Sequence, residues 1–350
     1  PCSSWAGTAG VPAERVAAHG PGRVNVIGEH TDYNDGLCLP FAIGRGVTVT
    51  GEPLFGWRIE AVAADIGEED SFEPRGIMPK PGWRAFVRGV AAELQAAGSP
   101  LRGTRLEIAG DLPRGAGLGS SAAMCVALAL TLLGREPPDR RELARLCSQV
   151  ERRWAGADTG LLDQLAVLLA EADHALRLDL RDLSATPVPV ELGDWTLAVL
   201  DSGAGREHSA SGYNERRAEC RAACDQLGLP SLRSAAAEDV ARLPAPLDAR
   251  VRHVVSENGR VEEAVSALQT GDLEWLGRLL DASHASLRED YEVSTPEVER
   301  AVEACREAGA AGARVMGGGF GGSVLALYPP GAEPVPGSLT VEPGPAARLI

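Results

Sequence analysis

The residues best suited to chemistry lie in one short stretch of this 350-residue chain, Gly22 to Ile43, where charged and hydroxylated side chains are interleaved with apolar ones. Carboxylates accept hydrogen bonds from hydroxyl groups, and an imidazole can donate or accept them. A surface loop would not require such a density of polar groups. The stretch therefore predicts the wall of a pocket for a small polyhydroxylated ligand. Its polar residues are Arg23, Glu29, His30, Thr31, Asp32, Tyr33, Asn34 and Asp35.

A second stretch, Leu112 to Met124, has the composition of a phosphate-binding loop. It reads LPRGAGLGSSAAM and continues into residues that favour helix. Glycine lets the backbone approach phosphate oxygens, and the first turn of a helix presents unpaired N–H groups at the positive end of its dipole. The Ser121 hydroxyl is a candidate ligand for Mg²⁺. The residues expected to hold phosphate are Gly115, Ala116, Gly117, Leu118, Gly119, Ser120, Ser121 and Ala122.

The same loop has alternative interpretations, which the sequence supports unequally. A Walker-type site is excluded because Lys80, the only lysine in the chain, stands between Pro79 and Pro81. Dinucleotide binding is poorly supported, since no acidic residue ends a second strand about 20 residues further on. A glycine-rich turn in which Ser120 caps the helix would explain the pattern without any ligand.

Predicted strands hold the first polar stretch in place. Val24, Val26 and Ile27 predict a strand that leads into it, and the alternating apolar residues from Leu37 to Ile43 predict a strand that leads away. The polar side chains would then lie at a turn between two strands. A further strand, around Leu106 to Ile108, leads into the glycine-rich loop.

Two carboxylates further along the chain are candidates for catalysis. An amphipathic helix is predicted over about residues 140–154, and an apolar helix follows Gly160. Asp163 lies at the start of that second helix, where a carboxylate often satisfies backbone N–H groups, although Asp158 is better placed to do so. Glu151 precedes two arginines and could instead make ion pairs on the helix surface.

Phosphoryl transfer would give these groups a reason to meet. The reaction needs an in-line hydroxyl and neutralisation of charge on the transferred phosphate more than it needs covalent help. We therefore expect Arg23 to lie between Asp163 and that phosphate, where its charge would stabilise the negative charge that develops.

The composition limits the kinds of partner. The chain is 44% hydrophobic, enough for a large core and two domains with a cleft between them. Its formal charge of −15 repels nucleic acid and anionic lipid.

The longest apolar run, Ala122 to Leu133, is too short to span a membrane, and no signal peptide is evident. Seven scattered cysteines favour reduced thiols in the cytoplasm; Cys220 and Cys224 are more simply small helix residues than a redox pair.

The second half predicts helices and one glycine-rich hairpin. Residues 212–309 read as helices, and Ser294 or Thr295 is expected to cap the last of them. Residues 314–328, RVMGGGFGGSVLALY, predict two strands joined by a glycine-rich bend that closes the floor of the site. The proline-rich tail, residues 329–350, is expected to form an edge strand or a peripheral wrap.

Five of these motifs, in order along about residues 20–350, resemble those of the galactokinases, a branch of the superfamily that includes homoserine and mevalonate kinases. The resemblance implies that Asp163 is the general base facing the anomeric hydroxyl of the sugar and that Glu151 binds Mg²⁺. It also implies that the glycine-rich loop binds ATP. The sugar pocket would consist of Glu29, His30, Asp32, Gly160 and Tyr213.

The resemblance also implies a fold and a reaction. The fold is α+β with two domains of the GHMP-kinase type, residues 1–185 and 186–350, each with a mixed sheet and helices, and with the site in the cleft between them. The reaction is ATP-dependent phosphorylation of D-galactose to galactose 1-phosphate, with Mg²⁺. A kinase of N-acetylgalactosamine or arabinose, and a galactose sensor, are the alternatives. An intact Gly119 to Ala123 segment ranks the sensor below catalysis.

Overall fold

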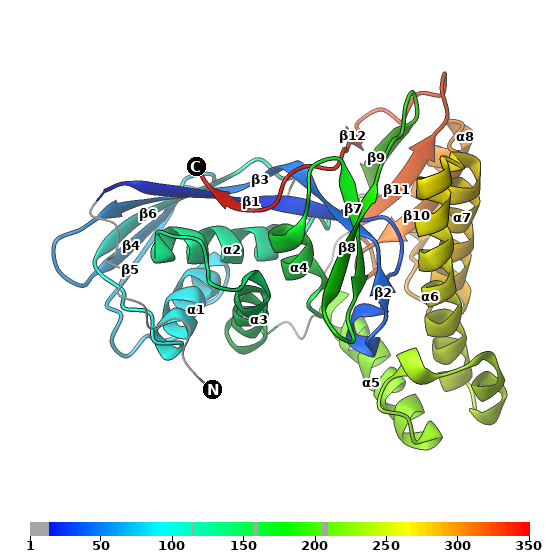
Figure 1. Cartoon of the computed structure of the whole chain (residues 1–350), viewed down its shortest axis with the longest axis horizontal. Helices are drawn as coiled ribbons and strands as arrows, with labels where there is room; N and C mark the ends of the chain where they lie inside the picture. Colours follow the sequence, from blue (N-terminus) through cyan, green and yellow to red (C-terminus); the bar gives the residue numbers. More distant parts are fainter. Residues whose placement is uncertain (1–13, 114, 157–159, 205–208) are drawn as a thin grey trace.

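A long sheet of six strands organises the first half of the chain (Figure 1). The computed structural model describes residues 14–113, 115–156, 160–204 and 209–350. In spatial order the strands are β13 (Arg348–Leu349), β1 (Val16–Asn25), β3 (Pro40–Pro53), β6 (Thr104–Gly110), β4 (Ile59–Ala63) and β5 (Glu68–Phe72). The sheet is mixed, because β4 and β6 pair in parallel while the other neighbours are antiparallel.

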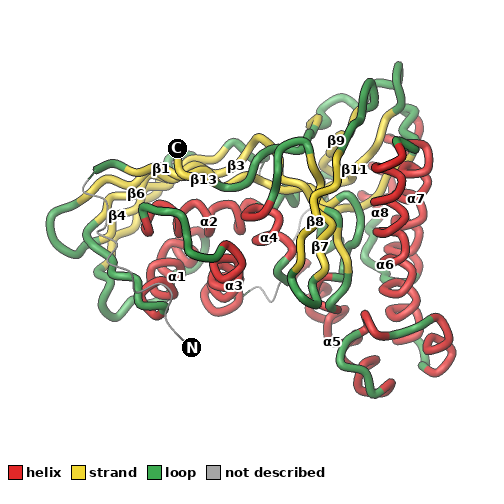
Figure 2. The backbone as a smooth tube through the Cα atoms, viewed as in Figure 1, coloured by secondary structure: helices red, strands yellow, loops and turns green. Residues whose placement is uncertain are grey.

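Helices cover one face of this sheet (Figure 2). They are α1 (Trp83–Ala96), α2 (Ser120–Leu133), α3 (Arg140–Val150) and α4 (Leu162–Leu169). The apolar run predicted from Ala122 to Leu133 is the core of α2, which lies against β1 and β3 and is buried almost throughout. Because α2 is apolar on all sides, it can be stable only between the sheet and the other helices.

The second half contains a separate antiparallel sheet. Its spatial order is β10 (Gly312–Met316), β11 (Ser323–Tyr328), β9 (Thr196–Asp201) and β12 (Leu339–Thr340). The predicted glycine-rich hairpin is confirmed as β10 and β11, which pair from Gly312 with Leu327 to Met316 with Ser323. Every pair in this sheet is antiparallel, so only the first-half sheet is mixed. The hairpin joins the edge strand β10 to β11, and a hairpin can join only antiparallel strands.

Helices make up most of the remaining second half, as the sequence predicts. They are α5 (Ser209–Leu227), α6 (Leu247–Thr270), α7 (Leu273–Glu289) and α8 (Pro296–Glu307), with short 3₁₀ turns at Leu232–Ser234 and Ala237–Arg242. The α6 and α7 helices pack together, and α7 and α8 contact β10. Thr295 is confirmed as the cap of α8, because its hydroxyl accepts from the N–H of Val298.

A small sheet lies between these two parts. It consists of β2 (Leu37–Cys38), β7 (His174–Asp179) and β8 (Ser184–Pro189), in that spatial order. The first-half strand β2 leads away from the polar stretch, whose 3₁₀ turn occupies Asp32–Asn34. The proposed domain boundary between residues 185 and 186 falls inside β8, and the division stays a prediction.

The C-terminal tail links the two large sheets. Its β12 strand pairs with β9 in the second-half sheet, and its β13 strand pairs with β1 in the first-half sheet. Between them, Gly344 bridges to Ala42 of β3. The tail therefore forms edge strands and also wraps across the molecule, and both predicted forms are confirmed.

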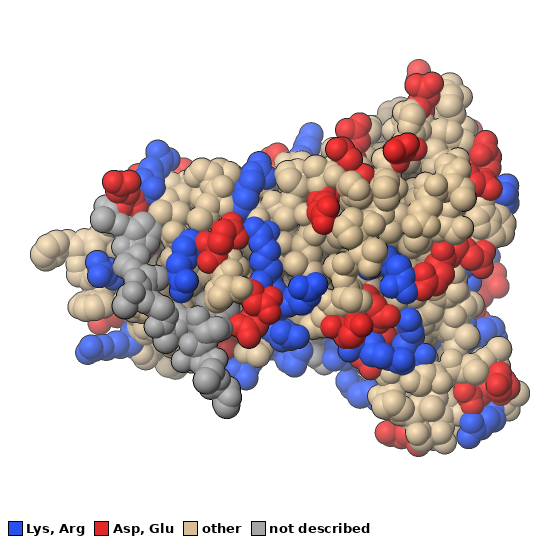
Figure 3. All heavy atoms as spheres, in the orientation of Figure 1, with Lys and Arg blue, Asp and Glu red and all other residues tan. Residues whose placement is uncertain are grey.

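The surface carries charges of both signs. On the face shown in Figure 3, Lys and Arg side chains lie among Asp and Glu side chains. Some of these charges form exposed ion pairs, such as Arg84 with Glu68 at 2.8 Å. Exposed pairs of this kind contribute little stability individually. In the part of the chain that the structure covers, no helix combines the length and the apolarity that crossing a membrane would need.

The contact between β1 and α2 allows a stability test. A Cβ atom on Gly20 would lie 2.2 Å from the carbonyl oxygen of Ala123 in α2. Because this oxygen is backbone, Gly20→Ala must push the helix away from the strand, and we expect it to lower the free energy of unfolding by about 1–3 kcal/mol. Denaturant unfolding followed by circular dichroism measures the change.

Gly44→Ala is the matched control. Gly44 lies in β3 and is exposed, and a Cβ atom added to it would have no other atom within 4 Å. Its substitution should leave the unfolding midpoint near that of the wild type. Equal stability of both variants would contradict the close packing of β1 on α2.

Candidate active site

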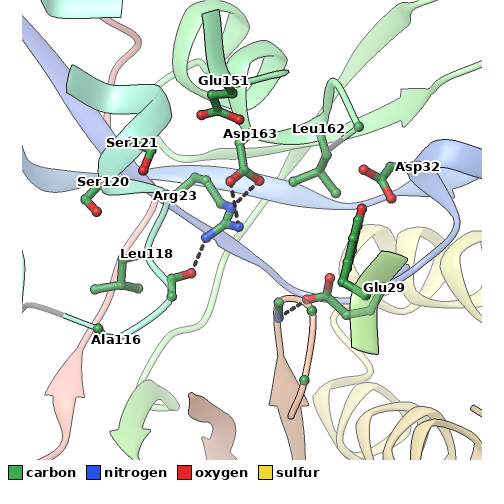
Figure 4. A pocket seen from close by; sticks show the side chains of 18 of the residues that line it. Arg23, Glu29, Asp32, Ala116, Leu118, Ser120, Ser121, Glu151, Leu162 and Asp163 are labelled. Atoms are coloured by element: carbon green, nitrogen blue, oxygen red, sulfur yellow. Dashed lines mark hydrogen bonds and ion pairs between the residues drawn. The ribbon is translucent and has the colours of Figure 1, made fainter. Parts of the chain in front are cut away.

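Arg23 lies at the centre of the site (Figure 4). Its Nε donates to Asp163 Oδ1 at 2.8 Å and its Nη2 donates to Asp163 Oδ2 at 2.9 Å, while Nη1 donates to the carbonyl oxygen of Gly117. One guanidinium therefore joins a carboxylate of α4 to the glycine-rich loop. The two residues are 140 positions apart in the sequence, and the predicted meeting of Arg23 and Asp163 beside that loop is confirmed as geometry.

An irregularity in the pairing of β1 with β3 aims Arg23 at these partners. Pro21 pairs with Gly46 but Arg23 pairs with Ala42, so three residues of β3 lie opposite Gly22, and a break of this kind re-aims the side chains next to it. A Cβ atom on Gly22 would lie 2.7 Å from Leu112 Cδ2. The N–H of Arg23 then donates to Leu118 O at 2.8 Å. Strand and loop are thus joined through both backbone and side chain.

The charge of Arg23 is fixed by its surroundings. Burial lowers the pKa of Arg23, but Asp163, next in size, and Glu29 raise it, so that the net pKa lies above the ordinary arginine value. The Arg23 side chain is 9% exposed and that of Asp163 is 30% exposed. Arg23 is therefore a permanent buried cation, whereas its carboxylate partner remains accessible from the cavity.

Asp163 reaches the site from the first turn of α4. The N-cap of that helix is Leu161, which makes no side-chain cap. Asp158, the residue better suited to capping by sequence, lies outside the described residues. The Asp163 carboxylate is instead bound by Arg23, so its position at the start of the helix serves the site.

The glycine-rich loop offers backbone rather than side chains. The side chains of Ala116 and Leu118 are buried in the core, and Ala116 O accepts from the Ser323 hydroxyl of β11 at 2.8 Å. Gly119, with φ of 72°, is the N-cap of α2. Ser120 is thus the first helical residue, and the capping role considered for it is not seen. The first N–H groups of α2 lie at the end of the helix that borders the cavity. Unpaired N–H groups at the start of a helix bind anions readily.

The carboxylate of Asp32 packs against a glycine from another segment. Asp32 lies in the turn of the polar stretch, residues 28–35, which we call the polar turn. A Cβ atom on Gly160 would lie 1.8 Å from Asp32 Oδ2, so only glycine leaves room for this carboxylate. Burial, then the charges of Asp163 and Glu29, raise the pKa of Asp32 to about 7. Asp32 therefore changes charge near neutral pH in the ligand-free protein.

His30 and Tyr213 form part of an aromatic cluster on the same wall. The His30 ring lies 5.4 Å from the ring of Tyr213 and 4.7 Å from that of Tyr291, and His30 Nδ1 lies 2.9 Å from the Tyr33 hydroxyl. Burial, followed by the charge of His253, lowers the pKa of His30 to about 3. His30 is therefore a neutral hydrogen-bonding group at any physiological pH.

Glu151 and Ser121 both line the cavity, and in Figure 4 they lie on the side of Asp163 away from Asp32. The predicted helix over residues 140–154 ends as α-helix at Val150, and Glu151–Ala155 forms a π-helical turn. Such turns are frequent at functional sites because they redirect side chains. Glu151 is only 5% exposed. A carboxylate and a hydroxyl next to a phosphate loop are the oxygen ligands that Mg²⁺ accepts.

These residues line one cavity of about 360 Å³, within the usual range for small-molecule sites. All the residues that were assigned a catalytic, sugar-binding, phosphate-binding or metal-binding role line it except Ala122, which is buried in α2 beneath the loop. The prediction that the whole polar stretch forms the wall was too broad, because Thr31, Tyr33, Asn34 and Asp35 do not line the cavity. The prediction that the glycine-rich bend closes the floor of the site is confirmed, because Gly317, Gly318 and Gly319 line the cavity.

The sequence reasoning missed several lining residues. The neighbour of Tyr213 was detectable; Phe86, on an ordinary amphipathic helix, was not. The missed residues are Phe86, Pro113, Gly156, Leu162 and Asn214.

Comparison with known families matches three stretches of this chain. The sequence matches the descriptions "GHMP kinases N terminal domain" over residues 85–171 and "GHMP kinases C terminal" over residues 264–335. It also matches "Galactokinase galactose-binding signature" over residues 7–53. The first match contains the glycine-rich loop and Asp163, and the last contains Arg23 and the polar turn.

Individual relatives agree with these matches. A galactokinase of Roseiflexus sp. (strain RS-1) is 43% identical over 327 residues, which cover 89% of this chain and 83% of the relative. One of Mycobacterium bovis (strain BCG / Pasteur 1173P2) is 41% identical over 90% of this chain and 89% of its own. The solved structure of Lactococcus lactis galactokinase complexed with galactose is 31% identical with a TM-score of 0.88, covering 96% of this chain and 95% of that one.

A more distant structure shares the fold alone. Mevalonate kinase of Methanococcus jannaschii is 18% identical with a TM-score of 0.67, and the match covers 91% of each chain.

The raised pKa of Asp32 predicts a pH-dependent effect on stability. Between about pH 4 and pH 7 the folded protein keeps a proton that the unfolded chain has released, so this group's contribution to stability is lost as pH rises. Asp32→Asn removes that loss. We expect the variant's gain in free energy of unfolding over the wild type to be roughly 1–2 kcal/mol larger at pH 8 than at pH 5, since solvent screens part of the effect.

Denaturant unfolding at the two pH values measures the gain. Asp225→Asn, at an exposed position on α5, is the control and should show no such difference between the two pH values. A gain for Asp32→Asn that is the same at both pH values would show that Asp32 is ionised throughout this range.

Proposed function

The chain belongs to the galactokinases of the GHMP kinase superfamily, and from this premise we propose that it transfers the γ-phosphoryl group of ATP to the anomeric hydroxyl of D-galactose. The products are galactose 1-phosphate and ADP. The observation that carries the proposal is the position of Arg23, which contacts both Asp163 and the loop that would hold the phosphates.

Asp163 is the residue that we assign to the sugar hydroxyl. Its bidentate pairing with Arg23 uses one lone pair on each oxygen, and a carboxylate has about four such sites in all. The remaining lone pairs can accept the proton of the anomeric hydroxyl from the cavity side. Arg23 holds the carboxylate in one orientation and stabilises the negative charge of the transferred phosphate.

The glycine-rich loop and the start of α2 bind the phosphates of ATP in this proposal. Residues 115–121 line the cavity, and three anchors hold their backbone: Arg23 at Gly117 and Leu118, and Ser323 at Ala116. A loop fixed in this way needs little reordering when the nucleotide binds. It therefore stabilises charge without a lysine.

Mg²⁺ is the cofactor that we infer, with Ser121 and Glu151 as its protein ligands. When bound, it would neutralise part of the charge on the β- and γ-phosphates. Mg²⁺ usually takes one or two carboxylates together with substrate phosphates and water, and this site offers one buried carboxylate and one hydroxyl. The donor set therefore fits the ion.

The sugar end of the cavity is suited to galactose. Glu29 and Asp32 offer oxygens to sugar hydroxyls, neutral His30 can donate or accept, and Gly160 leaves the Asp32 carboxylate its space. Tyr213 closes the wall beside His30. A site that pairs hydroxyls specifically rejects an epimer, because the epimer leaves buried polar groups unpaired.

The proposed setting of the reaction is the cytoplasm. The described cysteines are free thiols, which suits a reducing compartment. Galactose and ATP are the partners that the site itself requires, and neither is a macromolecule. The net charge of −15 disfavours nucleic acid and anionic membranes as further partners.

A coupled assay for ADP release tests the function. The wild-type protein with Mg-ATP should turn over galactose faster than glucose, N-acetylgalactosamine or arabinose. Asp163→Asn keeps the shape of the side chain but removes the proton acceptor, so we expect kcat to fall roughly 100- to 10,000-fold. Galactose binding, measured by calorimetry, should remain close to that of the wild type.

Asp225→Asn, at an exposed position far along α5, serves as the control and should retain full activity. No ADP release above background from the wild-type protein with galactose would reject the proposed function. Full activity of Asp163→Asn would reject the role assigned to that residue alone.

A further inference from the structure

Arg314 is a fully buried cation just outside the cavity. It lies on β10, is 0% exposed, and does not line the cavity. Its Nε donates to Val26 O at 2.7 Å, its Nη1 donates to Val315 O at 2.8 Å, and its Nη2 donates to the carbonyl of Asn25. The same Nη2 donates to Glu29 Oε1 at 2.9 Å. The guanidinium therefore connects the hairpin of the second half to the end of β1 and to the polar turn.

The hydrogen bonds of the Glu29 carboxylate to the described residues are all on one oxygen. Oε1 accepts from Arg314 Nη2 and also from the N–H of Gly317 at 2.8 Å (Figure 4). Among the described residues, no donor contacts Oε2, and Glu29 lines the cavity. Two donors on Oε1 fix the plane of the carboxylate and leave Oε2 for a ligand.

Other contacts hold the backbone of the same turn. On α6, Glu257 Oε1 accepts from the N–H of Gly28 at 3.0 Å, and His253 Nε2 lies 3.1 Å from Glu29 O. The α6 helix thus fixes the path of the turn, whereas Arg314 also fixes the Glu29 side chain. A substitution of Arg314 can therefore change the orientation of the Glu29 carboxylate while α6 still holds the backbone of the turn.

We propose that Arg314 is a positioning residue that sets sugar specificity through Glu29. By holding Oε1, it orients Oε2 toward one hydroxyl of the bound hexose, so discrimination at that hydroxyl depends on a residue that never contacts the sugar. The inference rests on the proposed function, because it takes a hexose as the ligand of Glu29.

The chemistry of arginine is needed for this role. The planar fork of a guanidinium can contact three carbonyls and a carboxylate at once, as it does here, whereas the ammonium of lysine is a single point charge. Arg314→Lys keeps the buried charge near Glu29 but cannot reproduce all four bonds. We therefore expect the carboxylate to lose its fixed orientation while its charge remains balanced.

The first step of the test identifies the hydroxyl. Wild type and Glu29→Gln are assayed with galactose and with its 2-, 3-, 4- and 6-deoxy derivatives. In the wild type, removal of the hydroxyl that pairs with Glu29 should lower kcat/KM at least about tenfold, since hydrogen bonds to charged groups are strong. In Glu29→Gln the penalty at that one position should shrink, while the penalties at the other positions stay.

The second step tests Arg314. Arg314→Lys should shrink the penalty at the same hydroxyl and raise KM for galactose about tenfold, with kcat changed by less than about threefold. Adding Arg314→Lys to Glu29→Gln should leave the specificity profile of Glu29→Gln unchanged. Arg88→Lys is the matched control, because Arg88 is 5% exposed on α1 and, among the described residues, donates to the carboxylate of Asp70 and to the carbonyls of Met78 and Ser71 rather than to the polar turn. It should keep the wild-type profile.

Three outcomes would overturn the inference. One is an unchanged deoxy-sugar profile in Glu29→Gln, and another is an Arg314→Lys variant that is slower with every sugar in the same proportion. If Arg314→Lys alone does not fold, Glu29→Gln is compared with Glu29→Gln/Arg314→Met, in which neither charge remains. A further change in profile between those two variants is the third such outcome. Absence of turnover by the wild type would instead reject the proposed function.

Discussion

The three-way contact of Arg23 with Asp163 and the carbonyl of Gly117 is the interaction on which the site depends. It joins strand β1, helix α4 and the glycine-rich loop at one guanidinium. A buried charge is costly unless it is paired and hydrogen-bonded, and this one is both. The contact therefore fixes the distance between the carboxylate that we assign to the sugar hydroxyl and the loop that we assign to the phosphates.

The rest of the fold holds these parts in position. The register shift between β1 and β3 at Gly22 aims Arg23, and apolar α2 holds the loop end against the sheet. The second half acts on the same site, because Ser323 of β11 anchors the loop and Arg314 of β10 holds Glu29. Sites preorganised in this way stabilise charge without reorganising during the reaction.

Local signals in the sequence predicted the parts of the site, and the meeting of these parts followed from the chemistry and from the family resemblance. The glycine spacing of residues 115–119, the isolated carboxylate at Asp163 and the glycine-rich hairpin all depend on short-range requirements of backbone and charge. The packing of Asp32 on Gly160 is a long-range contact with no periodic pattern. The same holds for the bonds of Arg314, which reach back 285 positions to Glu29. The π-helical turn at Glu151 also escaped prediction, because its sequence continues a helical pattern.

A double-mutant cycle on Arg23 and Asp163 tests the central claim most directly. Single-turnover rates of phosphoryl transfer would be measured for the wild type, Arg23→Lys, Asp163→Asn and the double variant, because groups that act as a unit are strongly non-additive. If Arg23 and Asp163 act as one unit, the rate of the double variant will be within about threefold of the rate of the slower single variant. A rate loss in the double variant equal to the product of the two single losses would show that the residues act separately and would contradict the account.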